Sequence, residues 1–156
     1  MESILIIRLS AMGDVVMASP LIRALHRCYP GARVAWLVQP EFAALLEANP
    51  ELDAVITWPR KEWEDLWRRR RYLRLAREVW RFRRRLRREG FDMVLDVHSL
   101  MKSGLLARLT GARRRVGLGS KEGSGALMTE VIPKPQSPRI GSEYLHLIEQ
   151  LGCDPG

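Results

Sequence analysis

The sequence contains few cysteines and no cluster of metal-binding residue types. Its 156 residues include two cysteines, Cys28 and Cys153, which stand far apart and lack the spacing typical of metal ligands. We therefore expect reduced thiols, no disulfide framework and a reducing compartment, the cytoplasm. We also expect no bound metal and no other cofactor.

Long apolar runs are absent as well. No stretch is long enough to cross a bilayer, and the first residues lack the basic and then apolar pattern of a signal peptide. Hydrophobic residues still make up 46% of the chain, which is enough for a packed core. We expect one folded domain over residues 1–156.

The glycine motifs of nucleotide-binding proteins are also missing from the first turn. Residues 4–9 are apolar and predict a buried strand, but the turn after them is neither GxGxxG nor a P-loop. Within this turn Ser10 interrupts the apolar run, and Gly13 is expected to allow a tight bend. Asp14 comes next, at or near the start of helical sequence. A carboxylate would repel phosphate, so Asp14 indicates either acid–base chemistry or simple capping of a helix.

The rest of the chain alternates between predicted strands and helices. Short apolar segments bounded by turn residues predict further strands at 33–38, 54–58, 91–97, 114–118 and 129–132. Helices are predicted at 20–29 with Ser19 as N-cap, and at 41–48, 62–89, 99–109 and 142–151. This alternation is typical of an α/β fold with a Rossmann-like, doubly wound and mainly parallel sheet. Such sheets bind ligands at the carboxyl ends of their strands.

The turn after the predicted strand 91–97 should open at the same edge of the sheet as the first turn. It contains His98, Lys102 and Ser103. A lysine near a helix N-terminus is electrostatically unfavourable unless an anion offsets it. Lys102 therefore indicates an anionic ligand, or else is an exposed lysine of no special role. His98 fits a structural role as well as a catalytic one.

The positive charge of the chain is concentrated in one segment. The net charge is +8, and residues 60–89 hold 14 Lys/Arg and 5 Asp/Glu, so this segment alone carries the excess. The predicted helix 62–89 also contains Trp63, Trp67 and Trp80. One interpretation is an ordinary helix with a solvated basic face. The other is an interfacial element, with tryptophans at headgroup depth and arginines on lipid phosphates.

Three motifs together carry a family resemblance. They are Arg8-Leu-Ser-Ala-Met-Gly-Asp-Val15 with Ser19-Pro20, Asp96-Val-His-Ser-Leu-Met-Lys-Ser-Gly104, and Ala107-Arg-Leu-Thr-Gly111. With these motifs the chain resembles the bacterial lipopolysaccharide heptosyltransferases of glycosyltransferase family 9, in particular their heptosyltransferase I branch. The resemblance implies the GT-B fold, in which two Rossmann-like domains enclose the active site. This chain matches the N-terminal, acceptor-binding half, so we expect it to lack the C-terminal donor-binding domain and to be inactive alone.

The resemblance also implies a reaction and a set of site residues. The reaction is an inverting, metal-independent transfer of heptose from ADP-heptose to Kdo–lipid A, with Asp14 as the general base. Acceptor-side contacts are implied for six residues: Ser10, Gly13, Arg60, Lys61, Lys102 and Ser103. The implied partners are this anionic glycolipid, a nucleotide-sugar donor held by the other domain, and the cytoplasmic face of the inner membrane.

A non-catalytic alternative rests on the charge alone. A basic segment is typical of modules that bind nucleic acid or an anionic membrane. The basic residues share a helix with tryptophans, whereas nucleic-acid folds commonly stack bases on aromatic residues of strands. We therefore expect no nucleic-acid partner. A third interpretation, a nucleotide-binding Rossmann domain, conflicts with the missing glycine motif.

Overall fold

A six-stranded parallel sheet forms the centre of the molecule. The computed structural model describes residues 3–10, 12–98, 100–119, 124–132 and 147. The strands are β1 (Ser3–Ile7), β2 (Arg33–Val38), β3 (Ala54–Thr57), β4 (Met93–Asp96), β5 (Arg114–Leu118) and β6 (Glu130–Ile132). Every neighbouring pair is parallel. This confirms the predicted α/β class.

The strand order places a switch point in the middle of the sheet. The order is β3-β2-β1-β4-β5-β6, so the chain winds outward from β1 in one direction and then returns to continue from β4 in the other. In the register of β1 with β4, Ile7 lies opposite Asp96, so the two strands end level with each other. Open α/β sheets bind ligands in the crevice at the carboxyl side of such a point.

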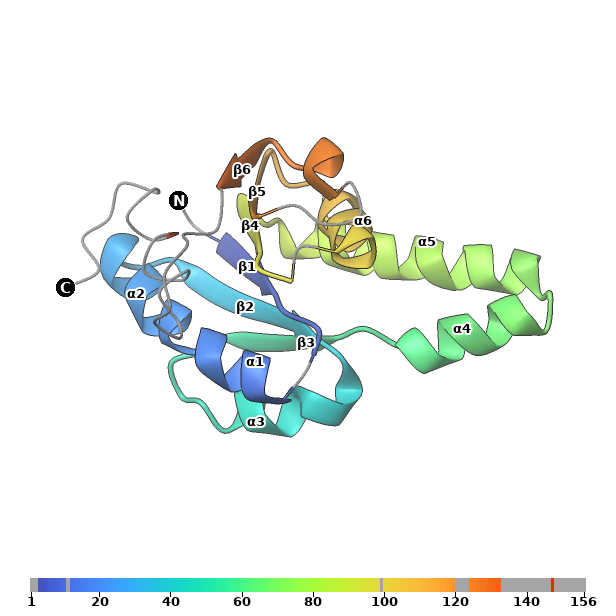
Figure 1. The fold of residues 1–156 in the computed structure, drawn as a ribbon, viewed down its shortest axis with the longest axis horizontal. Helices are drawn as coiled ribbons and strands as arrows, with labels where there is room; N and C mark the ends of the chain where they lie inside the picture. The colour runs from blue at the N-terminus through green and yellow to red at the C-terminus, as the bar shows by residue number, and fades with distance from the viewer. Residues whose placement is uncertain (1–2, 11, 99, 120–123, 133–146, 148–156) are drawn as a thin grey trace.

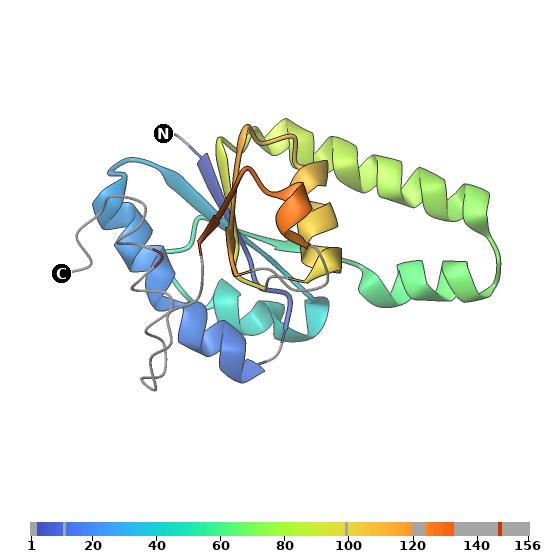
Figure 2. The same ribbon diagram turned by 45° about the horizontal axis from the view of Figure 1, so that its top comes forward.

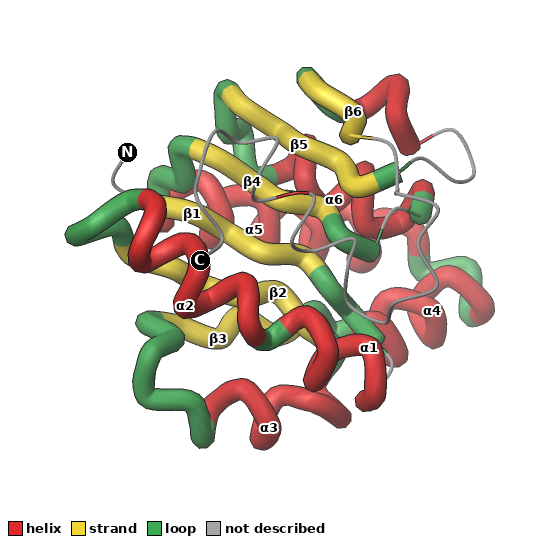
Figure 3. The backbone as a smooth tube through the Cα atoms, turned by 60° about the vertical axis from the view of Figure 1, so that its left-hand side comes forward, coloured by secondary structure: helices red, strands yellow, loops and turns green. Residues whose placement is uncertain are grey.

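Helices cover both faces of the sheet, which explains why the strands are apolar on both sides (Figures 1 and 3). One face carries α1 (Met12–Ala18), α2 (Pro20–Cys28), the single turn η1 (Pro40–Phe42) and α3 (Ala43–Glu47). The other carries α5 (Tyr72–Glu89) and α6 (Met101–Leu109), with α4 (Arg60–Arg68) beside α5. Ile4 and Ile6 belong to the core of the first face, and Leu5 and Ile7 to the core of the second. A short turn, η2 (Ser124–Leu127), precedes β6.

The single helix predicted over 62–89 is wrong, because the chain reverses direction within it. Arg70 adopts a left-handed conformation with φ of 57°, which ends α4. The Arg71 N–H donates to the carbonyl of Leu66 and the Arg70 N–H to that of Trp67, at 2.9 and 3.1 Å. These two bonds form a Schellman motif, which usually has glycine at the left-handed position. With arginine there, the sequence carries no sign of the break.

Aromatic packing explains why α4 folds back along α5. The Trp63 ring lies edge-on to Trp58 and to Phe82, with centroids 5.9 and 5.6 Å apart. Folding back therefore brings Phe82 of α5 against Trp63, whereas a continuous helix would carry Phe82 away from the core. The resulting helical hairpin projects well beyond the sheet (Figures 1 and 2).

Polar residues fasten the amino ends of neighbouring strands. Asp53, just before β3, accepts a hydrogen bond from the Val34 N–H at 2.8 Å, and its own N–H donates to the Val34 carbonyl. Asp92, just before β4, makes the same pair of bonds with Ser3 of β1. Thr129, before β6, repeats the arrangement with Arg115 of β5. The amino edge is therefore organised for stability.

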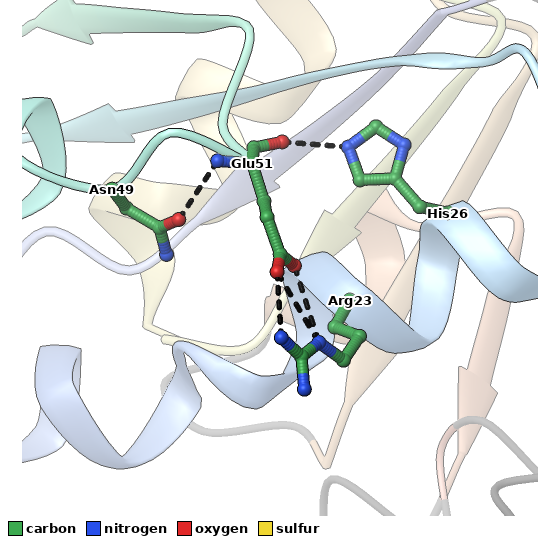
Figure 4. A network of polar contacts seen from close by, with 4 residues as sticks. All are labelled: Arg23, His26, Asn49 and Glu51. Carbon is green, nitrogen blue, oxygen red and sulfur yellow. Dashed lines mark hydrogen bonds and ion pairs between the residues drawn. The ribbon is translucent and has the colours of Figure 1, made fainter.

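A second polar network ties α2 to the loop before β3 (Figure 4). Arg23 donates two hydrogen bonds to Glu51 Oε1, at 2.8 and 3.2 Å. The Glu51 N–H donates to Asn49 Oδ1, and His26 Nε2 donates to the Glu51 carbonyl at 2.6 Å. The hydrogen bonds from Arg23 hold the pKa of the Glu51 carboxyl below its usual range, and Glu51 raises the pKa of Arg23.

The structure also bears on the expectations for the cysteines and for the last predicted helix. The expectation of reduced thiols is wrong for Cys28, which is disulfide-bonded. The other cysteine, Cys153, lies outside the described residues, as does the predicted helix 142–151 apart from Leu147, which is buried in the first core. Among the helices that the structure describes, none is long and apolar enough to span a membrane.

Candidate active site

The turn after β1 brings Asp14 to the carboxyl edge of the sheet. Helix α1 begins at Met12, earlier than predicted, so Asp14 lies in its first turn and not at a cap position. Its side chain is 52% exposed, so the carboxylate is open to solvent. Ser19, the predicted N-cap of the following helix, makes no capping bond and instead donates to the Val16 carbonyl.

Gly13 has a different role from the one predicted. It lies inside α1 and is not among the positive-φ glycines, so the tight bend expected there is wrong. A Cβ added at Gly13 would meet nothing within 4 Å. The backbone beside Asp14 therefore faces open space. Ser10, half-buried, lies between β1 and α1 in the same turn.

Arg8 joins the first turn to its neighbour. Its Nη2 contacts Asp14 Oδ2 at 2.8 Å, and its Nη1 donates to the Val97 carbonyl at 2.9 Å. The Arg8 side chain is only 14% exposed, and its Nε is buried without a hydrogen-bond partner among the described residues. One guanidinium thus positions the Asp14 carboxylate against the chain that leaves β4. A charge-assisted bond of this geometry is stronger than a neutral one.

The turn after β4 is organised by a buried carboxylate. Asp96, at the end of β4, accepts a hydrogen bond from the His98 N–H and one from the Ser103 hydroxyl, both at 3.1 Å. Ser103 Oγ also accepts from the Leu100 N–H at 3.0 Å, which caps the start of α6. Ser103 and Asp96 are both buried. This position favours a structural role for Ser103 over direct contact with a ligand.

Lys102 lies beside Ser103 in the first turn of α6 and is half-buried. Since β1 and β4 are neighbours and end level, the turns that carry Asp14 and Lys102 open at the same edge of the sheet. The prediction that these two turns open at the same edge is therefore confirmed. His98 is buried in the same turn.

Arg60 and Lys61 lie at the same edge but two strands away. They open α4, directly after β3, and β2 separates β3 from β1. Arg60 pairs with Glu64 at 2.7 Å, and the exposed Lys61 is 3.8 Å from Glu41 of η1. The structure thus places these two residues in an outer part of the same edge. Their predicted role as acceptor contacts stays a prediction, as do those of the other site residues.

Two residues of this edge escaped the sequence analysis as functional candidates. Arg8 is the single charge directly after the buried β1, and Asp96 is the last residue of the otherwise apolar β4. A charge at the end of a buried strand is itself a signal, because its cost must be offset by a specific partner. Within the described ranges, no group of three or more His, Cys, Asp or Glu residues is arranged to hold a metal ion.

Comparisons with known proteins agree with this architecture. Residues 79–153 match the family model "Glycosyltransferase family 9 (heptosyltransferase)". The chain is 31% identical over 117 residues to lipopolysaccharide heptosyltransferase 1 of Pseudomonas aeruginosa. This alignment covers 74% of this chain and 32% of that protein. It is 23% identical over 154 residues to the lipopolysaccharide core heptosyltransferase OpsX of Haemophilus influenzae, covering 97% of this chain and 41% of that protein.

The fold has a close counterpart among solved structures. Heptosyltransferase WaaC of Escherichia coli, solved with ADP-2-deoxy-2-fluoro heptose, superposes with a TM-score of 0.84 at 22% identity. The match covers 99% of this chain and 50% of WaaC. The chain thus spans between about a third and a half of the length of these relatives.

Proposed function

Because the chain belongs to glycosyltransferase family 9 (heptosyltransferase), we propose that it forms the acceptor-binding half of an inverting heptosyltransferase. In this proposal the donor is ADP-heptose, held by a second domain, and the acceptor is the Kdo–lipid A part of lipopolysaccharide. The names of the relatives support a heptosyl donor and a lipopolysaccharide acceptor.

One observation carries the proposal: the half-exposed Asp14 carboxylate lies at the carboxyl edge of the sheet, beside the switch point between β1 and β4. Ion pairing with Arg8 holds it there, and the backbone at Gly13 leaves room next to it. A carboxylate that is positioned and open to solvent is what a general base for an incoming hydroxyl requires.

The proposed reaction is a single displacement. An acceptor hydroxyl oxygen attacks the anomeric carbon of the heptose while the bond from that carbon to the ADP phosphate breaks. The hydroxyl proton passes to the Asp14 carboxylate, and ADP leaves with the bonding electron pair. Attack from the side opposite the leaving group inverts the anomeric carbon. Independence from metal is inferred from the family resemblance.

Basic residues at the same edge would hold the acceptor. Its phosphates and carboxylates suit lysine and arginine side chains. Lys102 is the candidate in the turn after β4. Arg60 and Lys61, which follow β3, are the candidates farther along the same edge. Since the acceptor is a lipid, we place the protein at the cytoplasmic face of the inner membrane as a peripheral protein.

The test is the Asp14→Asn variant in a protein that carries this chain together with its donor-binding half. We expect kcat to fall by about 100- to 10,000-fold, the usual contribution of a general base. Binding of Kdo–lipid A should change by less than about twofold, because asparagine keeps the shape of the side chain. Steady-state kinetics with ADP-heptose measure the first quantity and titration with the acceptor the second.

The matched control is Glu47→Gln, which removes an exposed carboxylate from α3 on the same face of the sheet. It should leave kcat unchanged. Near-normal turnover by the Asp14→Asn protein would show that another group takes the proton.

A further inference from the structure

The outer end of the helical hairpin has an unusual surface. The hairpin tip, residues 67–74, consists of Trp67, Arg68–Arg71, Tyr72, Leu73 and Arg74, with five arginines and no acidic residue. Its apolar side chains are turned outward: Leu73 is 91% exposed, Trp67 63% and Tyr72 50%. A leucine exposed to this degree on a regular helix does not contribute to the core of the chain.

Two of the three apolar residues are in contact, and the third follows them in the chain. Trp67 lies in the last turn of α4 and Tyr72 begins α5, and their rings meet edge-on with centroids 5.2 Å apart. Leu73 follows Tyr72 directly. The inward-facing residues of the same helices, among them Trp63 and Phe82, pack toward the sheet instead. The hairpin therefore has a covered base and an uncovered apolar end.

The tip stands clear of the other parts of the chain that the structure describes. Phe82 is the first buried residue of α5, and Tyr72 lies ten residues before it, so the free part of the helix extends about 15 Å. Figures 1 and 2 show this part of the hairpin beyond the sheet in both views. A convex end of this kind offers little of the area that a stable protein–protein interface needs, about 800 Å² per partner.

We propose that the hairpin tip inserts into an anionic phospholipid bilayer, with Leu73 below the headgroups, Trp67 and Tyr72 at the level of the headgroups and the arginines on the lipid phosphates. Tryptophan and tyrosine are the side chains enriched at the headgroup level of a membrane. The arginines around these apolar side chains are attracted to the negatively charged surface of such a bilayer. Insertion by the tip differs from a helix lying flat on the membrane, because Phe82 and Leu86 of α5 are covered by the sheet.

The inference refines the membrane location in the proposed function, but it depends on neither the acceptor nor the transfer reaction. Vesicles of phosphatidylcholine and phosphatidylglycerol, without any lipopolysaccharide, are therefore the appropriate probe. Failure of heptosyl transfer would leave vesicle binding unaffected, and failure of vesicle binding would leave the role of Asp14 untouched.

The experiment compares co-sedimentation of the whole chain and its Leu73→Ser variant with these vesicles. We expect the partition coefficient of the variant to fall by about tenfold, the order expected for an inserted leucine. The matched control Leu45→Ser, on an exposed leucine of α3, should bind within about twofold of the parent. Vesicles of phosphatidylcholine alone should bind the parent much more weakly, because the arginines then meet no net negative charge.

A second readout distinguishes insertion from adsorption. Phospholipids brominated on the acyl chains should quench tryptophan emission of the parent, and Trp67→Phe should remove most of that quenching. Equal partitioning of Leu73→Ser and the parent would overturn the proposal. So would displacement of the chain from vesicles by single-stranded RNA at equal charge, which would identify the tip as a nucleic-acid surface.

Discussion

At the scale of single residues, Arg8 contacts three separate segments of the described structure. Its guanidinium reaches both Asp14 on α1 and the Val97 carbonyl after β4, which is 89 positions away in the sequence. Its own carbonyl accepts a hydrogen bond from the Trp36 indole at 3.1 Å. One residue thus connects three neighbouring strands, β2, β1 and β4.

Replacing this residue should destabilise the chain measurably. For Arg8→Met we expect the free energy of unfolding to fall by about 1–3 kcal/mol, because the Val97 carbonyl loses a charged donor in a largely buried place. Urea unfolding followed by circular dichroism measures the change. The control Arg108→Met, on an exposed arginine of α6, should stay within about 0.5 kcal/mol of the parent. Equal stability of parent and Arg8→Met would mean that the contacts of Arg8 contribute nothing net.

At the scale of elements, the reversal between α4 and α5 depends on an unfavourable backbone conformation at Arg70. A left-handed conformation costs a residue with a Cβ roughly 1–2 kcal/mol relative to glycine. The aromatic contacts of Trp63 with Trp58 and Phe82 offset that cost.

Arg70→Gly should therefore stabilise the chain, by about 1 kcal/mol after the greater freedom of glycine in the unfolded state is allowed for. The matched control is Arg74→Gly, three residues into regular helix, which should lower the free energy of unfolding by about 1 kcal/mol. Denaturant unfolding of the two variants provides the comparison. A change in the free energy of unfolding of the same sign for both variants would contradict a strained backbone at Arg70.

The link between α2 and the loop before β3 should give stability a dependence on pH. Because Arg23 lowers the pKa of Glu51 in the folded state, the pair stabilises the fold at pH values above the ordinary range of glutamate titration. This contribution is lost as the pH falls through and below that range, because a protonated Glu51 no longer carries the charge that Arg23 binds.

Unfolding of the parent and of Glu51→Gln at a series of pH values tests this dependence. The difference between the two should be greatest near neutral pH and should shrink on acidification. Added salt should reduce it at neutral pH, since both side chains are exposed to solvent. A difference that grows on acidification would show that the sign of the coupling is wrong.

For the whole molecule, the strands and the parallel sheet could be predicted from the sequence, whereas individual side-chain contacts and the helix reversal could not. The strands 33–38 and 114–118 match the structure to the residue, because apolar runs between turn residues are strong local signals. The common edge of Asp14 and Lys102 followed from the parallel sheet alone. The ion pair of Arg8 with Asp14 and the reversal at Arg70 could not be predicted, since both depend on packing between segments and neither leaves a local mark.

The exposed tip should also make the hairpin the first site of cleavage by trypsin. Residues 68–74 offer five arginines in a segment whose backbone hydrogen bonds, among the described residues, lie within the hairpin, so local opening there is easy. Limited digestion followed by mass spectrometry should find the earliest cut within this range, and anionic vesicles should slow it. A first cut after Arg113–Arg115 would show that the hairpin is the more rigid part.

The strand order has a consequence for such a nicked chain. The tip separates β1–β3 from β4–β6 in the sequence, yet β1 pairs with β4 at the centre of the sheet, and residues from both sides of the tip share the second core. The covalent connection through residues 68–71 is therefore not what keeps the halves together. Two separately expressed polypeptides that divide at this point should assemble into the same domain, and the polar latch between Asp92 and Ser3 would lie across their junction.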